Sequence, residues 1–173
     1  MSAVDETLRK VKILIYVIVA ALLAGCGYKP LYGTASNGQG VASQLSSISI
    51  QETDTRVGQL IRNNLLSSMR PAGTAQQDLY SLVIKPSIAQ TLLAEGNAPD
   101  IHRMRLRLSV GYSLVENSSG KEVNSGKTFS NVSYDVVEEP IADLEAETNA
   151  TSKAAQEVGQ DIRIRLAAFM ANK

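Results

Sequence analysis

Cys26, the only cysteine of the 173-residue chain, ends a pattern that predicts a covalent modification. It follows Leu23-Ala24-Gly25, which in turn follows basic residues between positions 9 and 12 and an apolar run over 13–24. A positive segment, an apolar segment and small residues at a cleavage point are typical of a secretory signal peptide. The apolar run is shorter than the roughly 20 residues that a membrane-spanning helix needs. The cysteine indicates a bacterial lipoprotein signal, and a plain signal peptide followed by a chance cysteine is the alternative.

This pattern predicts three segments. Residues 1–25 are a lipoprotein signal peptide that is removed, and residues 26–42, which are mostly small and polar, are a lipidated N-terminus and flexible tether. Residues 43–173 form a single α+β domain. Cys26 carries an N-acyl and an S-diacylglycerol lipid, and each buried CH₂ contributes about 0.8 kcal/mol to membrane anchoring. We expect no other cofactor, because an acylated cysteine leaves the folded part without a thiol for a disulfide, metal site or nucleophile.

Three arginines form the second group with chemical potential. Arg103, Arg105 and Arg107 alternate with apolar residues in a segment, 104–115, that has the period of two typical of a strand. They therefore share one face, about 6.6–6.8 Å apart. Guanidinium groups bind phosphate and carboxylate well. A solvated face is the alternative, since two exposed charges about 7 Å apart in water repel by only about 0.6 kcal/mol.

The strand that follows decides whether this arginine row is neutralised. Residues 117–120 predict a turn, after which residues 121–136 return as a hairpin partner. A register centred on the turn places Tyr134, Val132 and Ser130 opposite the arginines, and none of these is acidic. A shift of one residue would instead bring Asp135 or Glu138 close to Arg103.

The remaining patterns predict the elements that position these residues. We expect strands over 45–50 and 79–86, in addition to the hairpin, and helices from an N-cap at Asp54 to about Arg70 and from Pro140 onward. Each helix has one apolar stripe. These elements predict an α+β fold: a two-layer sandwich of an about four-stranded sheet with two helices packed on one face, which leaves the other face open.

Several functional classes are disfavoured. The 17 basic and 17 acidic residues balance, which argues against nucleic-acid binding because that needs a basic domain. The only histidine, His102, has no acid–base partner fixed by spacing, and a loop residue is the simpler interpretation. No nucleophile or phosphate-loop motif is present. We therefore expect no catalytic residue, no metal site and no enzymatic activity.

The segment Leu23–Gly33, with its Cys-Gly-Tyr-Lys-Pro-Leu-Tyr-Gly run, resembles the LptE family of lipopolysaccharide-assembly lipoproteins. The resemblance continues at 56–65, at Ser-Tyr-Asp 133–135 with Pro140, and at 162–166, and so covers nearly all of residues 26–173.

This resemblance implies a lipid-anchored, periplasm-facing protein of the outer membrane. Such a protein acts with the LptD β-barrel as plug and assembly factor, binds lipopolysaccharide and helps deliver it to the outer leaflet. Basic residues of the sheet would bind the lipopolysaccharide: Arg103, Arg105 and Arg107, with Lys121 and Lys127 as weaker candidates. The alternative is a stand-alone periplasmic lipoprotein that binds or senses an anionic lipid or glycan without a barrel partner.

Overall fold

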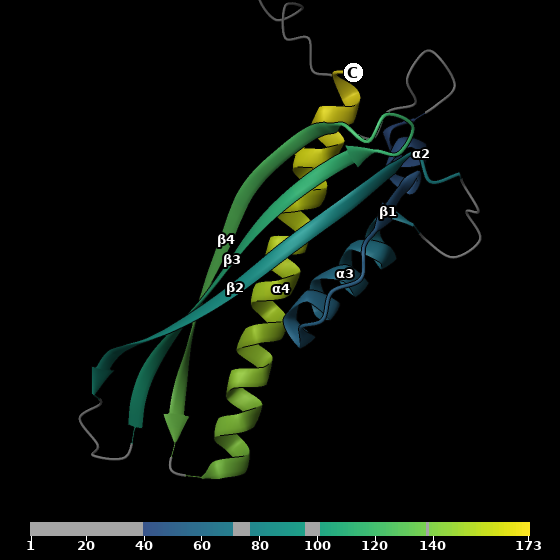
Figure 1. Ribbon diagram of the computed structural model, residues 1–173. Helices are drawn as coiled ribbons and strands as arrows, with labels where there is room; N and C mark the ends of the chain where they lie inside the picture. Colours follow the sequence, from purple (N-terminus) through teal and green to yellow (C-terminus); the bar gives the residue numbers. More distant parts are fainter. Residues whose placement is uncertain (1–39, 71–76, 96–100, 138) are drawn as a thin grey trace, which may run out of the picture. The chain divides into compact units, whose positions relative to one another are not determined.

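A computed structural model describes residues 40–70, 77–95, 101–137 and 139–173. Its sheet has the strand order β1-β2-β3-β4, in which β1 pairs parallel with β2 and the other pairs are antiparallel. The helices cover one face of this sheet (Figure 1), so the predicted two-layer α+β sandwich is confirmed. The elements in chain order are α2 (Val41–Ser46), β1 (Ile48–Ile50), α3 (Arg56–Met69), β2 (Tyr80–Glu95), β3 (Ile101–Glu116), β4 (Glu122–Val137) and α4 (Pro140–Ala171).

The core lies between the sheet and the two long helices. Strand β3 supplies its centre, because every second side chain from Leu106 to Leu114 is buried. Helix α4 packs over β4 and β3 and beside α3. Small residues allow this close approach: a Cβ added at Gly159 of α4 would lie 2.5 Å from Oδ1 of Asn64 in α3. The apolar stripes of both helices are buried here, namely Val57, Ile61, Leu65 and Met69 of α3, and Ala154, Val158, Ile162 and Leu166 of α4.

The N-terminal part of the domain differs from the sequence prediction. Residues 45 and 46 belong to α2, not to a strand, and β1 begins only at Ile48. Helix α2 starts at Val41, which is buried, so residues 41 and 42, which we assigned to the tether, belong to a packed helix. The cap of α3 is Thr55, whose side chain accepts a hydrogen bond from the Gly58 N–H at 3.1 Å; Asp54 was the wrong residue.

Strand β2 is longer than predicted, because it continues through Pro86 to Glu95. Proline has no N–H to donate to a neighbouring strand. Strand β1 pairs with β2 only as far as Leu82, so β2 is an edge strand beyond that point. Pro86 stays in register with Val110 of β3, and its missing donor costs no pairing on the free edge.

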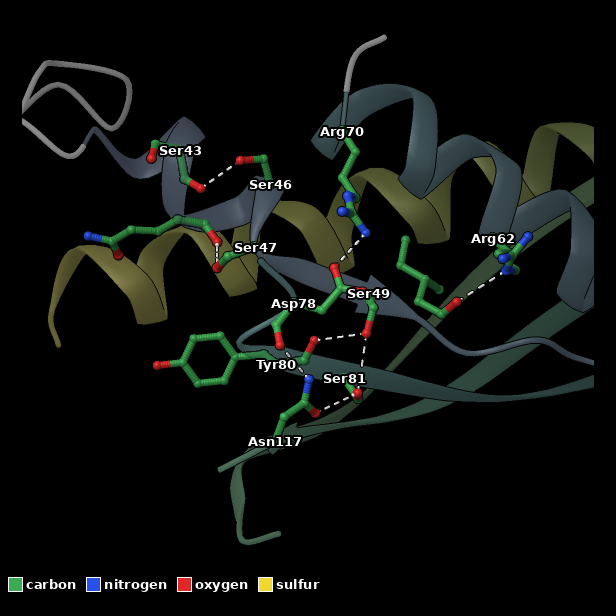
Figure 2. Close-up of polar contacts among 12 residues, drawn as sticks. Ser43, Ser46, Ser47, Ser49, Arg62, Arg70, Asp78, Tyr80, Ser81 and Asn117 are labelled. Atoms are coloured by element: carbon green, nitrogen blue, oxygen red, sulfur yellow. Dashed lines mark hydrogen bonds and ion pairs between the residues drawn. The ribbon is translucent and has the colours of Figure 1, made fainter. Parts of the chain in front are cut away.

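Polar contacts join the short strand β1 to the elements around it (Figure 2). The Ser49 hydroxyl donates to the Tyr80 carbonyl at 3.0 Å, and the Ser81 hydroxyl donates to Asn117 Oδ1 at 2.7 Å. Arg62 of α3 donates from Nε to the Ile50 carbonyl at 3.2 Å. The hydrogen-bonding groups of this cluster are paired with one another, so we interpret the cluster as structural.

In the part of the chain that the structure describes, no helix combines the length and apolarity that crossing a membrane requires.

Two leucines of α4 offer a matched test of this packing. Leu166 is fully buried, whereas Leu144 is 65% exposed. Leu166→Ala should lower the free energy of unfolding by about 2–5 kcal/mol, because it removes buried methyl groups and leaves a cavity. Leu144→Ala should change it by less than about 0.5 kcal/mol. Urea unfolding followed by circular dichroism measures both, and equal losses would contradict this account of the core.

Candidate anion-binding face of the sheet

The face of the sheet opposite the helices carries the predicted arginine row. Arg103, Arg105 and Arg107 alternate with the buried residues of β3, and all three are exposed. The strand period requires this, because consecutive side chains of a strand point to opposite faces. The expectation that one face packs on a core while the other stays open is confirmed for this strand.

The register of the β3–β4 hairpin differs by one residue from the register centred on the turn. Val115 pairs with Glu122, as that register requires, but Leu114 pairs with Asn124. The irregularity leaves Val123 as an extra residue on β4, which is the arrangement of a β-bulge. From that point on, Arg103, Arg105 and Arg107 face Asp135, Ser133 and Asn131. Tyr134, Val132 and Ser130, the predicted partners, are therefore wrong.

The corrected register neutralises one end of the row. Arg103 donates from Nε to Asp135 Oδ1 at 2.8 Å and from Nη2 to Oδ2 at 3.2 Å. This bidentate hydrogen bond lowers the pKa of the Asp135 carboxyl. Together with the charge attraction, it raises the pKa of Arg103. Both side chains remain about half exposed. The charge of Arg103 is thus partly neutralised by Asp135 and is less available to a ligand.

The other two arginines keep their charge available. The guanidinium carbon of Arg107 lies 4.2 Å from the ring centroid of Phe129, a cation–π contact, and the Phe129 side chain is itself 56% exposed. This contact orients Arg107 without cancelling its charge. Arg105 forms no ion pair or hydrogen bond with any residue that the structure describes.

A hollow lies on the same face of the sheet as the arginines, closer to the turn between β3 and β4. Lys85 of β2 and Lys127 of β4 both pair with Gly111 of β3, which places their Cα atoms roughly 9.5 Å apart. A Cβ added at Gly111 would meet nothing within 4 Å, so the glycine leaves open space between the lysines. The hollow has a volume of about 320 Å³, and Glu122 contributes one acidic group to its lining.

The two predicted lysines have different outcomes. Lys127 borders this hollow, whereas Lys121 is an exposed residue of the turn and does not line it. Sequence reasoning missed Lys85, because it precedes Pro86, where we expected the strand to end. We name Arg105, Arg107, Lys85 and Lys127 the cationic face.

His102 is not part of the cationic face. His102 lies on the opposite side of the sheet from the arginines, since it differs by one residue from Arg103 in the strand. Its Nδ1 is buried without a hydrogen-bond partner among the described residues. Among the described ranges, no group of histidine, cysteine and carboxylate side chains is placed to hold a metal ion. Cys26, the predicted lipid-attachment residue, lies outside the described residues.

Comparison with known proteins gives structural relatives only. No protein-family model matches the sequence, and no curated protein does. A crystal structure from Caulobacter crescentus CB15, provisionally named a lipoprotein, is similar with a TM-score of 0.62 and 29% identity, over 77% of this chain and 97% of that one. Rare lipoprotein B from Shewanella oneidensis matches with a TM-score of 0.48 and 16% identity, over 72% and 95%. A minor lipoprotein from Acinetobacter baumannii matches with 0.48 and 14%, over 71% and 91%.

The Arg103–Asp135 pair predicts a pH effect. Because the folded-state pKa of Asp135 is lowered, the pair contributes stability above the pH at which a free aspartate titrates, and loses it as pH falls through the lowered pKa. In an NMR titration of the side-chain carboxyl, Arg103→Gln should raise the pKa of Asp135 toward its ordinary value. Arg105→Gln is the control and should leave it where it is. An unmoved Asp135 pKa in Arg103→Gln would show that the pair does not form in solution.

Proposed function

We propose that this chain is an outer-membrane lipoprotein of the LptE type. It acts with an LptD-type β-barrel as plug and assembly factor, binds lipopolysaccharide and helps deliver it to the outer leaflet. The observation that carries the lipoprotein assignment is the likeness to the Caulobacter protein, which extends over 97% of that chain at 29% identity. The resemblance of residues 23–33 to the LptE family supports the barrel partner.

The anchor is the lipid on Cys26, which we propose holds the protein in the outer membrane on its periplasmic side. Helix α2 starts at Val41, and about 15 residues of sequence lie between Cys26 and this helix. A linker of this length with the small, polar composition of the predicted tether has an r.m.s. reach of about 20–25 Å. The domain is therefore not required to lie directly on the membrane surface.

The cationic face is the proposed lipopolysaccharide site. Lipopolysaccharide carries phosphate and carboxylate groups next to acyl chains. Arg105 and Arg107 offer guanidinium donors to the anions, and Lys85 and Lys127 add two further charges beside the open space at Gly111. The exposed ring of Phe129 offers apolar contact in the same surface. We propose binding without catalysis.

One observation favours the alternative of a stand-alone lipoprotein that binds an anionic lipid or glycan. The cationic face is built from β2, β3 and β4 of this one chain, so it needs no barrel to be complete. Co-purification with a barrel separates the two functions.

Removing one charge from the cationic face should weaken ligand binding. We expect Arg105→Ser to reduce lipopolysaccharide affinity about fivefold at low salt, which corresponds to about 1 kcal/mol. The loss should shrink as salt rises, because the screening length falls to about 10 Å at 0.1 M. Lys153→Ser, which removes one exposed charge from α4, should have no such effect.

Asp135→Asn should act in the opposite direction, because it releases Arg103 for the ligand. A gain in affinity cannot come from a misfolded variant. A direct binding assay with purified lipopolysaccharide measures all three variants. Unchanged affinity in both Arg105→Ser and Asp135→Asn would end the assignment of the ligand to this face.

The barrel partnership predicts a specific dependence in cells. When the chain is isolated from detergent-solubilised outer membranes, a large β-barrel protein should co-purify with it. Depletion of the chain should lower the amount of mature barrel, because the barrel then lacks its assembly factor. An isolated monomer, together with barrel levels that do not respond to depletion, would leave the stand-alone lipoprotein as the function.

A further inference from the structure

The first turns of α4 carry an apolar stripe that no other described element covers. Ile141 is 70% exposed and Leu144 is 65% exposed. Eighteen residues later, or about five turns along the same line of the helix, Gly159 is buried and Ile162 is fully buried. These four residues therefore lie on one side of α4, but other described elements cover only the later two.

The difference in coverage follows from helix length. Helix α3 has 14 residues and α4 has 32, so they are about 21 Å and 48 Å long. Asn64, in the second half of α3, meets α4 at Gly159, and α2 also packs against α4. Figure 1 shows that α3 accompanies the later part of α4 and does not reach its beginning. About the first 12 residues of α4, or roughly 18 Å, have no neighbour among the described helices.

The sheet contributes apolar side chains to the same region. Ile88 and Leu92 lie on the helix side of β2, opposite Leu108 and Met104 of β3, and they are 41% and 49% exposed. Between them, Gln90 donates from Nε2 to Glu147 Oε1 of α4 at 2.7 Å. This hydrogen bond links β2, at a point between its two exposed apolar residues, to α4. We name Ile88, Leu92, Ile141 and Leu144 the uncovered surface.

Acidic residues border the uncovered surface. The first turns of α4 contain Asp143, Glu145 and Glu147, and no lysine or arginine occurs between positions 139 and 152. Oδ1 of Asp143 is buried without a hydrogen-bond partner in the described part of the chain. Burial, together with the nearby charges of Glu147 and Asp143, raises the pKa of Tyr134 on β4. A ligand for this surface must be apolar in its centre and cationic at its edge.

We propose that the uncovered surface binds a helical segment of about three turns from a partner protein, with an apolar stripe at i, i+3 and i+4 flanked by lysine or arginine. Such a segment would take the position beside α4 that α3 leaves vacant. The acidic border disfavours anionic lipid. It also disfavours a second copy of this chain, because a two-fold contact would set the same acidic residues against each other. The partner is defined by this chemistry and not by the barrel proposed above.

Site-specific photo-cross-linking in cells tests this inference on the full chain. A photoreactive phenylalanine analogue replaces Leu144, and the same analogue replaces Ile164 as the control, an exposed residue on the other side of α4. Irradiation at position 144 should yield a cross-linked protein. Mass spectrometry of the cross-linked peptide should identify an amphipathic segment that contains lysine or arginine. The exposure of Leu144 makes the substitution compatible with folding, which thermal unfolding verifies.

A charge reversal completes the test. Glu145→Lys should lower the yield of the cross-link from position 144 about fivefold, because it places a like charge beside the basic segment. Glu157→Lys, the same change about three turns further along α4, lies in neither named surface and should leave the yield unchanged. A cross-link to lipid or to a second copy, a yield no higher than at Ile164, or a yield insensitive to Glu145→Lys would each overturn the inference. If the captured protein has the expected segment but is no barrel, the inference stands and the proposed barrel partnership fails.

Discussion

The packing of α4 and α3 on one face of the sheet is the constraint on which the rest of the structure depends. Alternate residues of β3, from Leu106 to Leu114, are buried against these helices, and this burial is the main favourable term for folding. A strand that commits one set of side chains to a core must direct the other set outward. The exposed arginine row is therefore a geometric consequence of the core, and any ligand of that row meets the side of the sheet that no helix covers.

Pairing between strands then decides how much charge this face presents. One extra residue at Val123 moves Asp135 opposite Arg103 and forms an ion pair. The same strand alignment brings Lys85 and Lys127 to either side of Gly111. Charge is thereby reduced at one end of the row and increased near the other. The proposed lipopolysaccharide site is therefore centred on Arg105, Arg107 and the two lysines. From the sequence, we had expected Arg103, Arg105 and Arg107 to contribute alike.

The two proposed binding surfaces differ in charge and lie on opposite sides of the sheet. The cationic face uses outward residues of β2, β3 and β4, whereas the uncovered surface uses the helix side of β2 and the first turns of α4. An anionic ligand is attracted to the first and repelled by the acidic border of the second. The two proposed ligands would therefore not compete for the same surface of this domain.

Local patterns in the sequence were sufficient for the period of β3, the turn before β4, the long helix after Pro140 and the two-layer class, because each depends on residues close together in the chain. The lipid signal at Cys26 is equally local and stays a prediction. Helix α2, the continuation of β2 past Pro86 and the pairing of Arg103 with Asp135 depended on which segments met in space. Burial of Val41 and the free edge beside Pro86 are properties of neighbours distant in sequence, and the bulge at Val123 depends on how β4 aligns with β3. Only the tertiary structure decided these three features, because the conformational preferences of the local sequence do not include the free energy of contacts with other segments.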